Sequence, residues 1–378
     1  MIARPYDVVV VGGGLSGLLV ARHLNGISRK DISNSNICWR LFEARPTLGG
    51  RLENDVGGNK VDMGGAWIWP KQQPRMSKLV ASLGLNTFTQ PDDLSSTRIQ
   101  GGAVELVKRL TTELPSEKIK TSSPVVACRL IAAQGTNNDE KPSSQSIISL
   151  TLESGEEVRT RHVVFAAPPK LLAKHIAFDP PLSHAKARAM EQSQTWMAGV
   201  TKVALIYNSP RFWPLNISNA VFRPAASKNQ PAFQVYDGSP EDGDNSAVSA
   251  VTFFTVASLS TAAEDDDATL ARHCVEQFAQ YLSSSNSREH VPNRVIEKFK
   301  AYDESHVKRW PKEKFISEDE YPRGINPHPE ATPLLAQSEW NGQLLFAGTE
   351  TDLHSPGVME GAVGAAIRVI DELRHIYF

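Results

Sequence analysis

The sequence predicts an α/β protein in which one domain is built on a parallel sheet and a second, smaller domain is mixed α/β. The first observation is the run Val8–Val11, which is typical of a strand buried on both faces of a parallel sheet. The second is the turn that follows, where Gly12, Gly14 and Gly17 have the spacing of a dinucleotide fingerprint. The third is another apolar strand, residues 37–42, directly before an acidic residue. Together they predict a Rossmann-like βαβ unit.

Each glycine of the turn has a separate physical role. Gly12 permits the tight turn, Gly14 lets a pyrophosphate approach the backbone, and Gly17 lets helix and strand pack closely. Leu15 and Ser16 begin the helix, whose N-terminal amides and partial positive charge then face the phosphates. Taken alone, the motif also fits a glycine-rich strand–helix turn, but the strand before it and the helix after it favour a bound dinucleotide.

Glu43 follows the second strand, where an acidic side chain can bind the adenosine ribose hydroxyls. It lies about thirty residues past the turn instead of the usual ~20. The polar segment 28–36 accounts for the difference. A solvated carboxylate at a strand end is the alternative.

Composition excludes several classes of partner. Among 378 residues, 40 basic and 42 acidic side chains give a net charge of −2, so neither nucleic acid nor an anionic membrane is indicated. Cys38, Cys128 and Cys274 lie far apart and form no metal-type or redox pair, which favours a reducing intracellular compartment such as the cytoplasm. No apolar run is long enough to span a bilayer, and the fingerprint starts too close to Met1 for a signal peptide. We expect a soluble protein with no metal site.

Elsewhere the chain alternates helices, strands and polar loops. Residues 92–100 are polar and predict a loop, and an amphipathic helix follows from Ala103. Strands are predicted at 124–131, 147–153 and 163–167 in the first domain, and at 200–207 and 247–256 in the second, where a helix spans 183–192. The segment 132–146 is rich in Asn and Ser and predicts a mobile loop.

Two Gly-Gly pairs, Gly49-Gly50 and Gly64-Gly65, indicate backbone brought close to something flat or bulky. Arg51 directly follows the first pair and could bind a diphosphate as a fork of donors, although a surface arginine is the plainer interpretation.

These segments, with 344–351 and 356–363 near the end of the chain, resemble the flavin-containing amine oxidase superfamily. That superfamily covers monoamine oxidases, polyamine oxidases, flavin histone demethylases and, more distantly, renalase and L-amino-acid oxidases. The resemblance implies an FAD-binding Rossmann-like domain (GR2-type) at 1–76, 98–169 and 318–378. It implies a substrate domain at 77–97 and 170–317, with the long helical insertion of the relatives almost absent and a more open active site.

The resemblance also implies how FAD is held. The Gly-Gly-Arg segment lies along the pyrophosphate and the second Gly-Gly pair against the isoalloxazine ring. Val125 gives a backbone contact to adenine, Glu350 accepts a ribityl hydroxyl, and the Met359 amide faces a pyrimidine carbonyl. The expected FAD-contacting set is Gly12, Gly14, Leu15, Ser16, Gly17, Glu43, Ala44, Arg45, Gly50, Arg51, Gly64, Gly65, Ala66, Trp67, Val125, Trp310, Gly348, Glu350, Val358, Met359 and Ala362. Because residues 321–326 contain no cysteine where monoamine oxidases attach their flavin, we expect noncovalent FAD.

Lys202 is the residue expected to take part in the chemistry. It shares one face of the predicted strand 200–207 with Val200, Ala204 and Ile206, and an ammonium on an apolar face is costly unless partnered. A lone lysine on an edge strand is the alternative. The segment resembles the family stretch whose lysine holds a water against flavin N5. The implied reaction moves hydride from an amine's α-carbon to N5, and O₂ reoxidises the flavin to give hydrogen peroxide.

The substrate itself is less well defined. The two tyrosines that flank the amine in monoamine oxidases are replaced approximately by Asn326 and Val358, and Trp69 stands where some polyamine oxidases have histidine. These replacements indicate neither a simple arylalkylamine nor a polyamine in particular. The expected substrate is a small-molecule amine, with Trp67, Trp69, Asn326 and Val358 lining its site. His184, His328 and His354 have no partner arrangement that supports a general base.

Two groups of alternatives stay open. The same scaffold supports renalase-like oxidation of dihydronicotinamides and desaturation of a C–C bond. A different class is a protein that binds FAD without turnover. The sequence leaves the oligomeric state undetermined.

Overall fold

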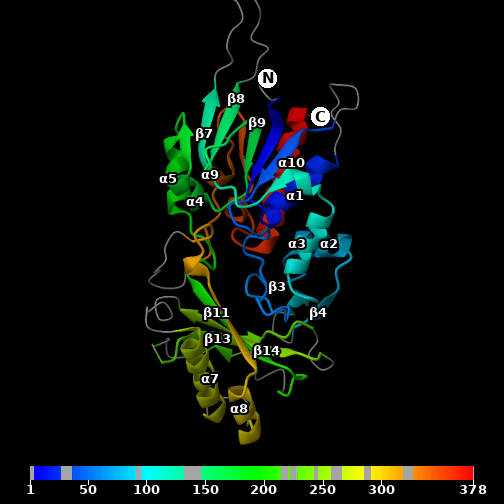
Figure 1. The fold of residues 1–378 in the computed structure, drawn as a ribbon, viewed down its shortest axis with the longest axis vertical. Coiled ribbons are helices and arrows are strands. Elements are labelled where there is room, and N and C mark those ends of the chain that lie inside the picture. Colours follow the sequence, from blue (N-terminus) through cyan, green and yellow to red (C-terminus); the bar gives the residue numbers. More distant parts are fainter. Residues whose placement is uncertain are drawn as a thin grey trace, which may run out of the picture. The chain divides into compact units, whose positions relative to one another are not determined.

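The computed structural model describes residues 4–26, 36–90, 95–131, 146–213, 220–221, 227, 229–241, 246–256, 266–284, 291–317 and 327–377 (Figure 1). The chain divides into two compact units, each made of separate chain segments. Unit 1 contains residues 1–50, 107–195 and 328–378, and unit 2 contains residues 51–106 and 196–327.

Unit 1 is built on an eight-stranded sheet with the order β10-β7-β8-β9-β1-β2-β6, and β16 also pairs with β9. Its strands are β1 (Tyr6–Val11), β2 (Trp39–Phe42), β6 (Ile119–Lys120), β7 (Val125–Ile131), β8 (Ile147–Leu152), β9 (Glu157–Phe165), β10 (Ala177–Asp179) and β16 (Leu344–Phe346). β1 is parallel to both of its neighbours, β2 and β9, while β8 is antiparallel to β7 and β9. Because β1 is central, Val8, Val9 and Val10 are fully buried. The predicted buried strand and its parallel pairing are confirmed, within a sheet that β8 makes mixed overall.

Helices cover this sheet, and their ends follow ordinary capping rules. The helical segments of unit 1 are α1 (Leu15–Asn25), η1 (Ser116–Lys118), α4 (Pro169–His175), α5 (His184–Gln192), α9 (Pro333–Ala336), η4 (Thr349–Thr351) and α10 (Met359–Tyr377). α1 packs against α10, the last helix. Ser183 caps α5 through its side chain, as the predicted helix 183–192 requires. α3 (Val104–Thr112) crosses the division between the units.

Unit 2 contains a five-stranded antiparallel sheet with the order β12-β13-β14-β11-β15 and a three-stranded one with the order β3-β5-β4. Its strands are β3 (Trp67–Ile68), β4 (Thr87–Thr89), β5 (Thr97–Ile99), β11 (Val200–Tyr207), β12 (Ala220–Val221), β13 (Ala232–Asp237), β14 (Ser249–Val256) and β15 (Glu304–Arg309). Its helical segments are α2 (Pro74–Ser82), α7 (Asp267–Ser283), α8 (Asn293–Lys300) and η3 (Trp310–Lys312).

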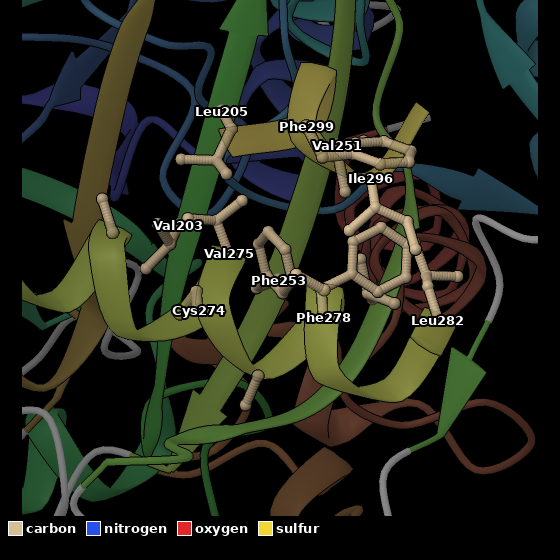
Figure 2. Packing of buried hydrophobic residues seen from close by; sticks show 14 of the residues in the cluster. Val203, Leu205, Val251, Phe253, Cys274, Val275, Phe278, Leu282, Ile296 and Phe299 are labelled. Atoms are coloured by element: carbon tan, nitrogen blue, oxygen red, sulfur yellow. The ribbon is translucent and has the colours of Figure 1, made fainter. Parts of the chain in front are cut away.

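The two faces of β11 have different neighbours. Val203 and Leu205 point toward α7 and α8, where Val275, Phe278 and Phe299 close an apolar core (Figure 2). The opposite face belongs to separate clusters with Ala204 and Ile206 in one and Val200 in another. Lys202 lies on this second face, which confirms the predicted alternation.

Two differences from the predictions concern the edges of unit 2. Residues 97–99, expected in a loop, form β5 because they pair with both β3 and β4. The compact units change at residues 50, 106, 195 and 327, whereas the predicted domains change at 76, 97, 169 and 317. The segment after Gly50 belongs to unit 2, where Val61 and Met63 pack against Ala204 and Ile206 of β11. Assignment of FAD and substrate to particular domains stays a prediction, and residues 132–145 of the expected mobile loop lie outside the described residues.

Candidate active site

Of the three fingerprint glycines in unit 1, Gly12 and Gly17 are tightly packed and Gly14 is open. A Cβ on Gly12, whose φ is +110°, would lie 2.7 Å from the Ala166 carbonyl oxygen, and one on Gly17 would lie 2.0 Å from that of Gly12. A Cβ on Gly14 would meet no heavy atom of the described chain within 4 Å. Gly14 is also the N-cap of α1, and the described first turn has neither a side-chain cap nor an acidic residue. An open helix N-terminus of this kind fits a diphosphate.

Glu43 lies beside this turn at the end of β2. Its carboxylate accepts hydrogen bonds from the backbone amides of Gly13, at 2.5 Å, and Arg45, at 2.8 Å. Burial raises the pKa of Glu43, and these amide bonds act in the opposite direction. The position suits the predicted ribose contact, which stays a prediction.

The first Gly-Gly pair also approaches the turn. The Gly49 amide donates to the Gly13 carbonyl at 2.9 Å, and a Cβ on Gly50 would lie 3.3 Å from the Gly14 Cα. Both glycines have positive φ, +113° and +58°. The Arg45 guanidinium donates to the Gly50 carbonyl at 2.8 Å, so the arginine holds the pair itself.

The C-terminal motif belongs to the same unit. A Cβ on Gly348 would lie 2.5 Å from the Ala167 carbonyl oxygen, so only glycine fits after β16. The Thr349 hydroxyl donates to the Val358 carbonyl at 2.6 Å, which closes the loop before α10 begins at Met359. Glu350 is fully buried.

Residues predicted from distant parts of the sequence thus belong to one unit. Those of the predicted FAD set in unit 1 are Gly12, Gly14, Leu15, Ser16, Gly17, Glu43, Ala44, Arg45, Gly50, Val125, Gly348, Glu350, Val358, Met359 and Ala362. Backbone amides at a helix N-terminus and buried carboxylates are donors and acceptors that a dinucleotide can use, so this set fits the predicted cofactor.

The remaining predicted residues belong to unit 2. They are Arg51, Gly64, Gly65, Ala66, Trp67, Trp69, Lys202 and Trp310. A Cβ on Gly64 would lie 1.9 Å from the Arg51 carbonyl oxygen, and the Gly65 amide donates to that same oxygen at 3.1 Å. The second Gly-Gly pair is therefore packed against the backbone of the Gly-Gly-Arg segment.

Lys202 is fully buried in a central strand, paired with β14 on one side and β15 on the other. An edge-strand position is excluded. Its Nζ lies 2.6 Å from the Gly64 carbonyl oxygen, 3.1 Å from the Tyr236 hydroxyl and 3.3 Å from the Asp62 carbonyl oxygen. Desolvation lowers the pKa of Lys202 to about 7, with Asp62 raising it and Arg98 lowering it further.

Aromatic rings surround this amine. Nζ lies 4.8 Å from the ring centroid of Phe254, 5.4 Å from that of Tyr236 and 5.9 Å from that of Trp67. Trp67 is half-buried, lies 4.4 Å from Tyr236 by ring centroids and donates its indole N–H to Gln90 Oε1 at 3.2 Å. Its ring and that of Trp69 are 6.4 Å apart. Trp310 is buried, and its indole N–H donates to the Met63 carbonyl at 2.9 Å.

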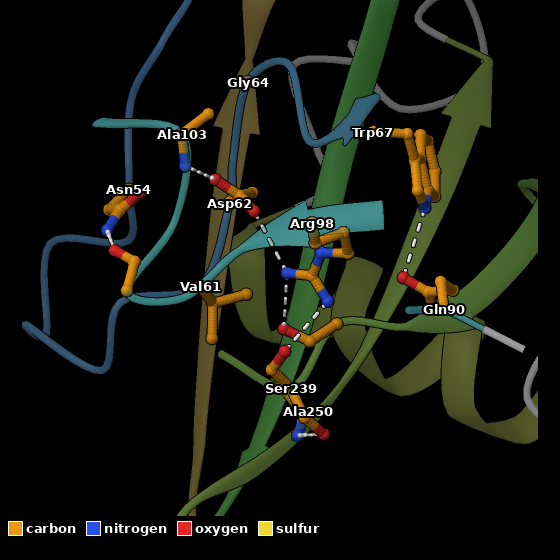
Figure 3. Close-up of polar contacts among 12 residues, drawn as sticks. Asn54, Val61, Asp62, Gly64, Trp67, Gln90, Arg98, Ala103, Ser239 and Ala250 are labelled. Atoms are coloured by element: carbon orange, nitrogen blue, oxygen red, sulfur yellow. Dashed lines mark hydrogen bonds and ion pairs between the residues drawn. The ribbon is translucent and has the colours of Figure 1, made fainter. Parts of the chain in front are cut away.

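The sequence did not identify Arg98 as a residue of the site. It lies on β5, is 1% exposed, and forms an ion pair with Asp62 at 3.0 Å (Figure 3). The surrounding sequence is polar and suggested a solvated loop. The available signal was the alternation Thr97-Arg98-Ile99, which is too short to establish a strand.

The other candidates are exposed, half-buried or outside the described residues. His184, His328 and His354 are exposed, which supports surface positions. Asn326 lies outside the described residues, and half-buried Val358 belongs to unit 1. All three cysteines are free, and no group of potential metal ligands occurs among the described residues. Within the same residues no helix has the length and apolar character needed to cross a membrane.

The fold and the glycine turn define a protein with an NAD(P)-binding Rossmann-like domain, whose family model matches residues 10–83. The model of the flavin containing amine oxidoreductases matches residues 92–373, most of the chain. The chain therefore belongs to the flavin containing amine oxidoreductase family, as the resemblance implied.

Individual relatives match a short part of the chain. Polyamine oxidase 5 of Oryza sativa subsp. japonica is 35% identical over 95 residues, which cover 25% of this chain and 18% of that protein. Flavin-containing amine oxidase B of Cavia porcellus is 41% identical over 88 residues, covering 23% and 15%. These matches span less than a fifth of each relative's length.

Solved structures match the whole fold. Putrescine oxidase bound to putrescine superposes with a TM-score of 0.70 at 16% identity, covering 98% of this chain and 99% of that one. Cyclohexylamine oxidase from Brevibacterium oxydans gives 0.70 at 16% identity, covering 98% and 100%. At 16% sequence identity, these superpositions support the fold alone.

Proposed function

We propose that this chain is an FAD-dependent oxidase that transfers hydride from the α-carbon of a small amine to flavin N5. The imine is hydrolysed to a carbonyl compound, and O₂ accepts the two electrons to give hydrogen peroxide. The observation that carries the proposal is the family match across residues 92–373, which includes segments of both units. Bound noncovalently, FAD supplies the hydride acceptor, and the chain orients the amine and excludes water.

Lys202 is proposed to act on the water and the oxygen. As an ammonium it has three N–H bonds, which match its three acceptors. As a neutral amine it donates two and can accept from the Tyr236 hydroxyl. To hold the water that hydrolyses the imine as well, the Lys202 amine must share one of these three hydrogen bonds with that water. In its protonated form the cation favours the negative charge that develops when O₂ is reduced.

The decisive experiment is anaerobic. The purified protein, with its flavin spectrum verified, is mixed with primary amines, polyamines, amino acids and dihydronicotinamides while flavin absorbance is followed. Bleaching by an amine, with peroxide formed when air is admitted, is the expected result. Bleaching by dihydronicotinamides alone assigns the renalase-like reaction. A carbon–carbon double bond in the product assigns desaturation, and no bleaching by any compound favours an FAD-binding protein without turnover.

The flavin site has its own matched pair of variants. Gly14→Ala adds a methyl group into open space, so the fold should survive while flavin retention falls at least tenfold. Gly17→Ala forces a contact with the Gly12 carbonyl and should lower stability itself. Measuring bound flavin and unfolding temperature separates the effects. Full flavin retention in Gly14→Ala would show that the pyrophosphate lies elsewhere.

A further inference from the structure

A buried ion pair links the two structural elements that hold Lys202. Asp62 and Arg98 are each 1% exposed. The Asp62 carboxylate accepts from Arg98 Nη2 at 3.0 Å through one oxygen and from the Ala103 amide at 2.7 Å through the other. Both carboxylate oxygens are thus anchored, and with them the backbone of residues 62–64, whose carbonyls bind Lys202.

Arg98 also binds the second element. Its Nη1 donates to the carbonyls of Asp237, at 3.1 Å, and Ser239, at 2.8 Å, and its Nη2 donates to that of Gly238 at 3.2 Å. This turn directly follows Tyr236, whose hydroxyl is the third partner of Lys202. Figure 3 shows the guanidinium between Asp62 and the turn at Ser239. One side chain therefore fixes the positions of all three Lys202 partners.

The charges of the pair oppose each other at Lys202. The Asp62 carboxylate raises the pKa of the amine and the Arg98 guanidinium lowers it, so the pair anchors the site while adding little net charge. Within the part of the chain that the structure describes, the neighbouring strands present a neutral group and a paired one. On β14 the residue opposite is Phe254, and on β15 it is Lys308, whose ammonium binds Glu53 and Glu313, each at 2.6 Å.

We propose that Asp62 and Arg98 are positioning residues for Lys202, holding its three partners in place as a charge-balanced pair. The role of Lys202 in turnover rests on the proposed function; its positioning by the pair does not. The two charges by themselves predict shifts of opposite sign when each is removed, because each acts on the amine with opposite sign. A positioning role predicts a further effect: the titration midpoint of Lys202 should fall when the charge of Arg98 is kept but its hydrogen-bond geometry is lost, because the amine then loses acceptors that favour its charged form.

The test reads the amine directly in the FAD-loaded protein. Lysines labelled with ¹³C at the ε-methylene are titrated by NMR, and the Lys202 signal is identified by its absence in Lys202→Met. Asp62→Asn should lower the titration midpoint of Lys202 by roughly one pH unit, and Arg98→Met should raise it by a similar amount. Lys186, in unit 1 with its own charged neighbours, is the internal control and should not move.

Arg98→Lys keeps the positive charge but cannot reproduce the planar fork that holds Asp62 and the three turn carbonyls. The Lys202 midpoint in this variant should therefore fall below that of wild type. An unchanged midpoint in Arg98→Lys would show that the pair acts by charge alone and overturns the positioning role, and an unchanged midpoint in Asp62→Asn overturns the charge balance. A lowered midpoint in Arg98→Lys, in a protein that oxidises no amine, would keep the positioning role and refute the proposed function.

Discussion

Two lysines of the described residues are buried, one in each unit, in different surroundings. Lys186 on α5 is 1% exposed, and its Nζ donates to the carbonyls of Leu335, at 2.7 Å, and Gln337, at 2.8 Å. It lies 3.5 Å from the ring centroid of Phe346. Lys202 on β11 likewise binds two carbonyls and lies over aromatic rings. Desolvation lowers the pKa of each to about 7.

The two lysines differ in the structural elements that supply their hydrogen-bond partners. Lys186 binds the C-terminal end of α9, where cations commonly satisfy free carbonyls. Its charged neighbours are Glu339, Arg368 and Glu372. Lys202 instead binds the segment that carries the second Gly-Gly pair and a tyrosine anchored by Arg98. A lowered pKa alone therefore does not identify a functional lysine, because burial produces it in both places.

The largest expected effect is shared by both lysines and concerns stability against pH. Unfolded lysine titrates near 10.4, so between pH 7 and 10.4 the unfolded chain binds more protons than the folded one. Each lysine should therefore make the free energy of unfolding rise with pH, by about 3–4 kcal/mol across this window. The reference is the variant that lacks that lysine, Lys186→Met or Lys202→Met. Urea unfolding at a series of pH values measures it. If the difference in unfolding free energy between wild type and one variant did not change with pH, the lysine replaced in that variant would stay protonated in the folded protein.

Turnover should separate the two. We expect Lys202→Met to slow flavin reduction or reoxidation about a hundredfold, the range found when one electrostatic contact is removed from an active site. Lys186→Met, the matched control, should change these rates less than threefold because its partners are structural. Stopped-flow absorbance resolves both half-reactions. Equal rates in Lys202→Met and wild type would refute the proposed role.

A smaller effect concerns the helix that carries Lys186. The Ser183 hydroxyl accepts from the Lys186 amide at 3.4 Å and donates to Glu339. Ser183→Ala should cost about 1 kcal/mol of stability, as loss of an N-cap commonly does. Thermal unfolding tests this, with Ser183→Thr as the conservative control. Lys202 lies on a strand and does not depend on this helix cap, so its titration midpoint should be the same in Ser183→Ala as in wild type.

The smallest effect sharpens the charge assignment at Lys186. Glu339 raises the pKa of Lys186, so Glu339→Gln should lower it and change stability at neutral pH by less than about 1 kcal/mol. The same ε-methylene titration measures the shift. A higher titration midpoint of Lys186 in Glu339→Gln than in wild type would mean that another charge controls the pKa of this lysine.

Much of unit 1 could be predicted because its signals are local. The valine strand, the glycine spacing and the C-terminal motif each lie within a short run, and backbone geometry requires those residue types there. The predicted face of Lys202 was also correct, because alternation along a strand fixes it. The site residues of both units stay predictions as cofactor contacts.

The sequence by itself determined the family, the dinucleotide-binding sheet and Lys202 as an amine on an apolar strand face, since these depend on residue type and short-range periodicity. Only the tertiary structure decided that Lys202 lies in a central strand, and that Arg98, more than a hundred residues away in sequence, positions its partners. Sheet pairing and buried hydrogen bonds join residues that are distant along the chain. Their energy depends on the burial and alignment that only the folded chain provides.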